Sequence, residues 1–181
     1  MVEGISDELV IEETARKLAT FRTGFMPLDV AGVTVVNNNG WGNLEATGKF
    51  FKSLEIKTFA FHDDGASADP RYFDLVKVHP YRGIEKLLIE EIPLSELDTF
   101  LSQCQAYPDY PSGITLEAGW GTKEKVYAIL KRRKGEGYAA KLIALCDQEN
   151  KLPKTIIEFL ENLVNAPTTI STTAASAGRS E

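Results

Sequence analysis

Two acidic residues near the start of the sequence, Glu3 and Asp7, could together bind a metal ion if the fold brings them to one place. Val2 is predicted to end a short strand, Gly4 permits a tight turn, and a helix is expected to begin at Ser6, a good N-cap. A strand, a turn and a helix bring both carboxylates to the edge of an α/β sheet at which ligands bind. Capping and the helix dipole also place acids here, and for each residue alone that structural role is the commoner one.

A second pair of acids, Asp63 and Asp64, follows an apolar stretch at residues 56–61 that is typical of a buried strand. Strands that alternate with helices run parallel, so their carboxyl ends meet at one edge of the sheet. Asp63, Asp64 and Glu3 are therefore expected at the same edge. Carboxylate oxygens are the ligands that Mg²⁺ takes in proteins, so the sequence predicts a divalent cation site there.

The alternation of strand and helix patterns predicts an α/β domain built on a parallel sheet. Strands are predicted at residues 33–36, 56–61 and 72–78 besides the one that ends at Val2, and helices at residues 6–18, 43–54, 81–91, 93–101, 122–134, 138–146 and 156–164. A proline-containing loop at residues 107–113 marks a boundary. We expect a catalytic domain at residues 1–105, a small helical appendage at 106–165, and a disordered tail at 166–181.

Basic residues gather in the predicted helix at residues 122–134. The candidates for contacts with nucleic-acid phosphates are Lys123, Lys131, Arg132 and Arg133. An ordinary solvated helix face is an equally good interpretation, because Glu124 interrupts the run. The Gly40-Trp41-Gly42 loop is similarly ambiguous, since a plain strand-to-helix turn explains it better than a phosphate-binding loop does.

Composition limits the functional classes. The 181 residues carry a net charge of −6, which argues against a uniformly basic surface but allows a local positive patch. No apolar run is long enough to span a membrane, no signal peptide precedes the first motif, and the two cysteines lack metal-site spacing. We therefore expect a cytoplasmic protein without a membrane partner, monomeric in this form.

Several of these stretches together resemble a Toprim domain. The matching stretches are Val2-Glu3-Gly4-Ile5-Ser6-Asp7, then Asn39-Gly40-Trp41-Gly42-Asn43, then a strand that ends in Asp63-Asp64. The nearest resemblance is to the Toprim nuclease half of the OLD (overcoming lysogenization defect) family, whose later region is similar to Ile84-Glu85-Lys86-Leu87-Leu88 and to Lys134-Gly135-Glu136-Gly137-Tyr138-Ala139-Ala140. The similarity covers roughly residues 1–145.

The resemblance implies a metal-dependent DNA endonuclease that uses two Mg²⁺ or Mn²⁺ ions, with Ca²⁺ as a non-catalytic substitute. The implied metal ligands are Glu3, Asp7, Asp63, Asp64 and Glu85, and the implied catalytic residues are Glu3, Asp63 and Lys134. Two cations about 4 Å apart can activate water and stabilise the leaving oxygen of a phosphodiester. Lys141 is the alternate lysine, and Glu117 is a further acid ranked below Glu85.

One motif departs from the family pattern. The usual Toprim pair is Asp-x-Asp, whereas this chain has Asp63-Asp64-Gly65, so either Asp64 substitutes with shifted geometry or a water or another residue fills the gap. In such family members an ATP-binding ATPase domain precedes the Toprim domain, and the short first strand is consistent with a fragment that lacks it. Two alternatives remain: a catalytically inactive Toprim that binds nucleic acid or a partner, and a topoisomerase-like or primase-like Toprim.

Overall fold

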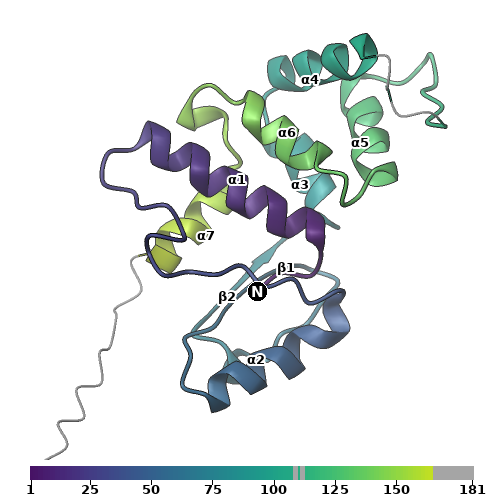
Figure 1. Ribbon diagram of the computed structural model, residues 1–181. Helices are drawn as coiled ribbons and strands as arrows, with labels where there is room; N and C mark the ends of the chain where they lie inside the picture. The colour runs from purple at the N-terminus through teal and green to yellow at the C-terminus, as the bar shows by residue number, and fades with distance from the viewer. Residues whose placement is uncertain (108–109, 111–112, 165–181) are drawn as a thin grey trace, which may run out of the picture.

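The structure is a computed structural model that describes residues 1–107, 110 and 113–164, and it places helices on both faces of a parallel sheet (Figure 1). This confirms the predicted α/β class, while the predicted tail at 166–181 lies outside the described residues. The strands are β1 (Phe59–Asp63) and β2 (Leu75–His79). The helices are α1 (Ile5–Phe21), α2 (Leu44–Ser53), α3 (Ile84–Glu91), α4 (Leu94–Ala106), α5 (Thr122–Arg132), α6 (Tyr138–Leu145) and α7 (Lys154–Val164), with short 3₁₀ helices at Trp41–Asn43, Pro70–Tyr72 and Glu149–Lys151.

The N-terminal residues extend the two-stranded sheet. The Met1 ammonium donates to Phe59 O at 2.7 Å, and Phe61 N donates to Met1 O at 3.0 Å, which is the pattern of a parallel pair. On the other side, Val2 forms an isolated parallel bridge with Asn37. Four extended segments therefore lie side by side, in the order 36–38, 1–3, β1 and β2.

The order of these segments reverses beside the N-terminus. Segment 36–38 is the second along the chain, 1–3 is the first, β1 is the third and β2 is the fourth. From the 1–3 segment the chain therefore continues to one side of the sheet, and from β1 it continues to the opposite side. Ligands of open α/β folds bind at the carboxyl ends of the strands where this reversal occurs. Glu3 and Asp63 are the residues at those two ends.

Three predicted strands have different limits, and the first of them, predicted at residues 56–61, is β1 at Phe59–Asp63. The 72–78 prediction is wrong at its start, because Pro70–Tyr72 is a 3₁₀ helix and β2 begins at Leu75. Residues 33–36 form no strand, and only Asn37 makes a bridge. The physical reason is that Val36 O accepts one backbone hydrogen bond from Val2 N, whereas residues 33–35 make none to another extended segment among the described residues, so no ladder forms.

The alternation of side chains along β1 separates two apolar regions. Phe61 faces α1 and α7 and contacts the Phe159 ring at a centroid distance of 5.1 Å. Ala60 faces the other way and packs with Leu44 of α2 and with Phe73. Figure 1 shows the same division, with α1 and α7 on one side of the strands and α2 on the other.

Substitution of Gly48 tests the packing of α2 on the sheet. A Cβ added at Gly48 would lie 2.4 Å from Phe73 Cζ, whereas one added at Gly42 meets nothing within 4 Å. Overpacking costs typically about 1–3 kcal/mol and should exceed the gain of about 1 kcal/mol in helix propensity. We expect Gly48→Ala to lower the urea midpoint of unfolding and Gly42→Ala to leave it nearly unchanged. Adding Phe73→Leu should restore much of the loss, and a Gly48→Ala protein as stable as the parent would contradict this packing.

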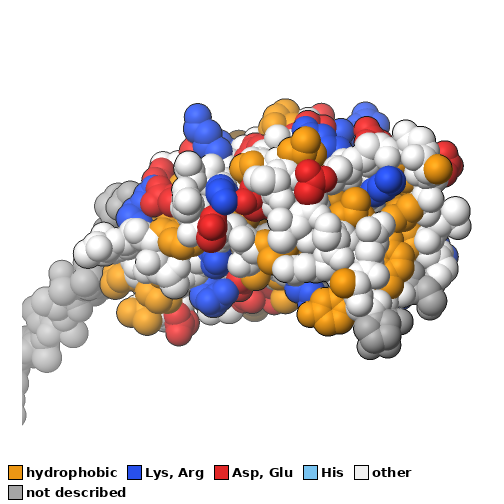
Figure 2. Space-filling model, turned by 90° about the horizontal axis from the view of Figure 1, so that it is seen from above, with side chains coloured by type: hydrophobic (Ala, Val, Ile, Leu, Met, Phe, Trp, Pro, Cys, Tyr) orange, Lys and Arg blue, Asp and Glu red, His pale blue; other side chains and the backbone are white. Residues whose placement is uncertain are grey.

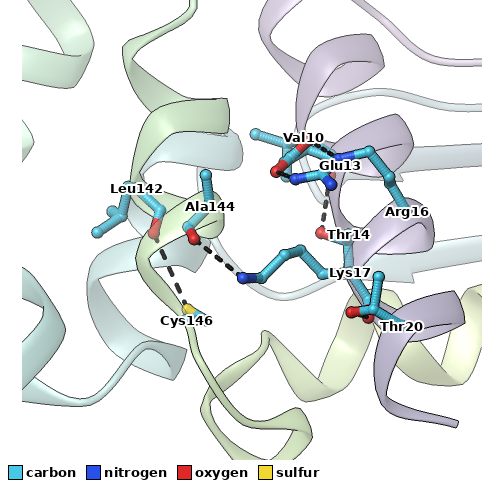
Figure 3. Close-up of polar contacts among 9 residues, drawn as sticks. All are labelled: Val10, Glu13, Thr14, Arg16, Lys17, Thr20, Leu142, Ala144 and Cys146. Carbon is cyan, nitrogen blue, oxygen red and sulfur yellow. Dashed lines mark hydrogen bonds and ion pairs between the residues drawn. The ribbon is translucent and has the colours of Figure 1, made fainter.

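Helix α6 packs along α1 and fixes the C-terminal half of the chain against the N-terminus. Figure 3 shows Lys17 reaching from α1 to the end of α6, where its Nζ donates to Ala144 O at 3.0 Å. One apolar cluster includes Val2 and Leu18 from the first part of the chain and Ile129 and Ile143 from the last. The predicted division into residues 1–105 and 106–165 therefore does not correspond to two separate cores, and it stays a prediction.

Every helix within the described ranges is too short or too polar to cross a lipid bilayer.

Candidate functional site

Glu3 and Asp63 are adjacent at the carboxyl edge of the sheet. Glu3 Oε1 accepts a hydrogen bond from Asp63 N at 3.1 Å. The Asp63 carboxylate is held by two backbone amides: Oδ1 accepts from Gly65 N at 2.8 Å, and Oδ2 accepts from Gly83 N at 2.9 Å. Gly83 has φ of +81°, a left-handed conformation that favours glycine, so the sequence Arg82-Gly83 suits this turn. The strand end and the turn after β2 thus fix the orientation of Asp63.

Asp7 lies at the start of α1, in the turn after Glu3. The N-cap of α1 is Gly4, and Asp7 Oδ2 accepts from Gly4 N at 3.1 Å. The prediction of Ser6 as the N-cap is therefore wrong by two residues, since the third helical residue, Asp7, already satisfies the free amide. Ser6 instead accepts a hydrogen bond at Oγ from Gly135 N at 3.2 Å.

The contact between Ser6 and Gly135 brings the segment after α5 to the start of α1. A Cβ at Gly135 would lie 2.9 Å from Ile5 Cγ2, and its φ is +77°, so both the approach and the backbone conformation favour glycine. The residue before it, Lys134, pairs with Glu85 at 3.2 Å between Nζ and Oε1. The sequence contains no local signal for this contact, which joins residues far apart in the chain.

Glu85 is a buried acid in the first turn of α3. Its side chain is 4% exposed, whereas that of Lys134 is 58% exposed. Among the described residues Glu85 Oε1 accepts no hydrogen bond, and its contact with the Lys134 ammonium is an ion pair. Leaving a buried carboxylate oxygen without a donor is costly, so this site favours a further positive charge.

The pKa values show that these acids interact. Burial raises the pKa of Asp7 to about 7, and the charges of Glu3 and Glu85 contribute to this rise. The pKa of Glu3 is also raised, chiefly by burial and then by the charge of Asp63, although hydrogen bonding to Asp63 N and the charge of Lys134 oppose the shift. Glu3, Asp7, Asp63 and Glu85, called the acidic cluster below, therefore form one electrostatic unit with Lys134.

The acidic cluster has the donor chemistry of a hard divalent cation. All its potential ligands are carboxylate oxygens, which suit Mg²⁺ and Mn²⁺ rather than softer metals. No three His, Cys, Asp or Glu side chains converge closely enough to make a ready-made metal site within the residues described. A bound cation would therefore draw these side chains together. Its positive charge would offset the repulsion between the carboxylates, which contributes to the raised pKa values of Asp7 and Glu3.

Three other predicted residues lie apart from the acidic cluster or make no contact with it. Asp64 is exposed in the turn after β1, and Gly65 occupies the place of the second acid of the usual pair. Glu117 is exposed in the segment before α5. Lys141 stacks on the Tyr138 ring, with Nζ 4.8 Å from the centroid. Of the two candidate lysines, Lys134 is the one that contacts the cluster.

Three of the four predicted phosphate contacts have partners within the protein. Lys123 forms an ion pair with Glu90 at 2.8 Å, and Arg133 forms one with Glu136 at 3.0 Å. Lys131 lies over the Tyr127 ring, while Arg132 is exposed. On the face drawn in Figure 2 the basic side chains are interspersed with acidic ones and do not form a continuous positive surface.

Two histidines beside the acidic cluster were not predicted from the sequence. His62 and His79 are 2% and 1% exposed, and His79 lies opposite Asp63 in the parallel register of β1 and β2. His62 Nδ1 lies 2.7 Å from Asp63 O. The sequence feature that could have identified His79 is its position at the end of an apolar strand, immediately before a turn.

Comparison with known proteins identifies the N-terminal part of the chain. Residues 1–64 match the family model described as "Overcoming lysogenization defect protein-like, TOPRIM domain". A search of curated proteins and a search of solved structures found no match. The matched part contains Glu3, Asp7 and Asp63, whereas Glu85 and Lys134 lie beyond it. Toprim domains generally bind divalent metals such as Mg²⁺, and this family indicates a nuclease-type function that acts on nucleic acid. The chain therefore carries, in residues 1–64, the Toprim domain of the OLD-like family.

Proposed function

We propose that this protein is a metal-dependent DNA endonuclease and that the acidic cluster with Lys134 is its active site. The observation that carries the proposal is that Glu3 and Asp63 are adjacent at the sheet edge where the strand order reverses, and that the charges of Glu3 and Glu85 both act on Asp7. Three of these four acids lie in the part of the chain that matches the Toprim family. The fourth, Glu85, is brought to them by α3.

The acidic cluster is proposed to hold two divalent cations, Mg²⁺ or Mn²⁺, with Ca²⁺ as a non-catalytic substitute. Glu3, Asp7 and Asp63 would hold one ion, and Glu85 would contribute to the second, with exposed Asp64 as a further ligand on the solvent side. When bound, such ions activate the attacking water and stabilise the leaving oxygen of a phosphodiester. Glu3 and Asp63 are the proposed catalytic ligands because each sits directly at a strand end.

The chain's own residues position this chemistry. The amides of Gly65 and Gly83 hold the Asp63 carboxylate, each using one of its oxygens and leaving a further lone pair on both. The protonation equilibrium of Asp7 lies near neutral pH, so a cation competes with a single proton for this carboxylate. Lys134 is more than half exposed beside Glu85, where its ammonium can approach the phosphate of a substrate.

The nucleic-acid substrate is proposed to be DNA, with phosphate contacts from Lys123, Lys131, Arg132 and Arg133 beside the active site. Lys134 and Arg133 are neighbours in sequence, so the end of α5 connects the basic residues to the acidic cluster. Exchange of internal ion pairs for phosphate contacts would make binding sensitive to salt. An ATPase domain in the same protein is a further proposed partner, by resemblance to the family.

A second candidate is a Toprim module that binds nucleic acid without cutting it. Gly65, in the position of the second acid, is the observation that favours this candidate. Incubation of the purified chain with supercoiled plasmid in Mg²⁺, Mn²⁺, Ca²⁺ or EDTA separates the two. The nuclease proposal predicts nicked or linear product with Mg²⁺ or Mn²⁺ and none with Ca²⁺ or EDTA. Plasmid that is retarded in a gel but remains intact under every condition would favour the binding module.

Substitution of Lys134 tests its role in the transition state. If its ammonium neutralises charge that develops during cleavage, Lys134→Ala should lower the single-turnover rate at saturating protein by about 10²–10³-fold and leave DNA affinity nearly unchanged. Lys141→Ala is the matched control, since Lys141 stacks on Tyr138, and it should retain the parental rate.

A role of Lys134 in binding alone predicts a different result. If Lys134 only contacts phosphate, Lys134→Ala should weaken binding and reduce the salt slope by about one while the saturated rate stays normal. A normal saturated rate in Lys134→Ala, with a reduced rate in Lys141→Ala, would move the role to Lys141.

A further inference from the structure

Trp41 lies open to solvent on the loop at residues 39–43, which connects the carboxyl end of the 36–38 segment to α2. It is 61% exposed and packs into neither of the two apolar regions beside the sheet. Within the described ranges its indole makes no aromatic or cation–π contact. A buried indole removes about 150–250 Å² from water, so the folded chain alone gives up much of this stabilisation.

The loop that carries Trp41 is anchored to the strand end that carries Glu3. Gly40 N donates to Glu3 O at 2.7 Å, so the residue before Trp41 contacts the backbone of the first acid of the acidic cluster. On the other side of Trp41, Asn43 Nδ2 donates to Asn38 O at 3.0 Å and closes the loop. Trp41 is therefore held beside the acidic cluster by contacts on both sides of it in the chain.

The backbone on each side of Trp41 leaves room for a flat ligand. A Cβ added at Gly40 or at Gly42 would meet nothing within 4 Å. Gly40 also has φ of +116°, a conformation that L side chains rarely adopt. With a glycine before and after it, the indole has no neighbouring side chain in the loop to cover its ring, and a planar group can approach it.

The charge of the surroundings indicates which planar group this is. The acidic cluster carries the same sign of charge as phosphate, so contacts that need no charge are favourable beside it. Stacking of a nucleobase on an aromatic side chain is such a contact, and it contributes about 1–3 kcal/mol per base. In an intact duplex the faces of a base are covered by its neighbours, so the base has to be unpaired and unstacked to reach the ring.

We propose that Trp41 stacks on an unpaired base of the strand whose phosphate lies at the acidic cluster. This inference rests on the proposed function and specifies its substrate: DNA with unpaired bases next to the phosphate that is cut. Trp41 binds and positions the strand and takes no part in the bond-breaking step. Its contribution to affinity is independent of salt, in contrast to that of a phosphate contact.

Binding of two oligonucleotides in Ca²⁺, measured by fluorescence anisotropy, tests this proposal. One is an oligothymidine, and the other is an abasic strand of the same length, which keeps the phosphates but lacks the bases. We expect the parent to prefer the oligothymidine by about 5–100-fold. Trp41→Ala should lose most of this preference, while its affinity for the abasic strand and the salt slope of binding stay parental. Trp41→Phe should retain part of the preference, because the phenyl ring can still stack.

Phe50→Ala is the matched control, because Phe50 is 57% exposed near the other end of α2, and it should keep the parental preference. Equal losses in Phe50→Ala and Trp41→Ala would overturn the proposal, since any exposed aromatic residue would then have the same effect. A parent that shows no preference, including one that binds neither strand, would also overturn it, as would an unchanged preference in Trp41→Ala.

The failure of this proposal and the failure of the proposed function give different results. A parent that prefers the oligothymidine through Trp41 but leaves plasmid intact in Mg²⁺ and Mn²⁺ contradicts only the nuclease. A parent that cuts plasmid, with a base preference that Trp41→Ala leaves unchanged, contradicts only the base site.

Discussion

Replacement of Glu3 by Gln is expected to reduce DNA cleavage with Mg²⁺ by on the order of 10³-fold, and replacement of Asp63 by Asn should do the same. Loss of one ligand removes several kcal/mol of transition-state stabilisation, and each 1.4 kcal/mol corresponds to about a tenfold change in rate. Glu3 Oε1 also accepts from the backbone amide of Asp63, so the two proposed ligands are held next to each other. Single-turnover cleavage of plasmid under saturating protein measures the effect.

These two substitutions keep the shape of the side chains, so folding can be controlled. In Glu3→Gln the side-chain amide oxygen can still accept from Asp63 N, and in Asp63→Asn the side-chain oxygen can still accept from one of the two glycine amides. Glu117→Gln is the matched control, because Glu117 is exposed in the segment before α5 and its variant should cleave at the parental rate. Parental cleavage rates in a folded Glu3→Gln or Asp63→Asn protein would show that the acidic cluster is not the catalytic centre.

Asp7→Asn is expected to stabilise the metal-free protein at pH 8 while abolishing its stabilisation by Mn²⁺. The pKa of Asp7 is raised from its ordinary value of 3.8 to about 7 by burial and by neighbouring acids. The folded protein therefore binds a proton that the unfolded chain releases, and stability falls as the pH rises from about 4 to about 7. Above this window the ionised carboxylate costs on the order of 4 kcal/mol, and Asn removes that cost.

Urea unfolding in EDTA between pH 4 and pH 8 measures this effect as the difference between Asp7→Asn and the parent. The difference should be small at pH 4, grow toward pH 7 and then stay constant. Glu8→Gln is the control, since Glu8 lies in the same helical turn and its charge acts on Glu12 rather than on the acidic cluster. With saturating Mn²⁺ the parent should gain stability and Asp7→Asn should not. If the difference in the free energy of unfolding between Asp7→Asn and the parent does not change with pH, ionisation of Asp7 does not destabilise the folded protein.

The sequence predicted the parts of this site that follow from local pattern. Alternating strands and helices imply a parallel sheet, and parallel strands end at one edge, so Glu3 and Asp63 could be placed together before the structure was known. The resemblance to the OLD-like Toprim family rests on the same stretches, and the family match covers them. The features that depend only on neighbouring residues in the sequence could therefore be predicted.

The contacts that orient the site could not be predicted, because they join distant segments. Gly83 N reaches Asp63 across the turn after β2, and Gly135 N reaches Ser6 only because α6 packs along α1. Ser6 is a good N-cap by type, yet the free amide of Gly4 is satisfied by Asp7, which moves the start of α1. Residues 33–36 have strong strand propensity, yet among the described residues only Val36 forms a backbone hydrogen bond with a neighbouring extended segment, and propensity alone does not say whether a pairing segment is present.

Binding of Mn²⁺ to the metal-free chain, measured by calorimetric titration, tests the central claim most directly. The claim is that Glu3, Asp7, Asp63 and Glu85 bind divalent cations as one site. We predict saturable binding to the parent and to Glu117→Gln, and loss of that binding in the double variant Glu3→Gln with Asp63→Asn, with circular dichroism showing that each protein is folded. Saturable binding of equal stoichiometry and affinity to the double variant, or no binding to the folded parent, would contradict the claim.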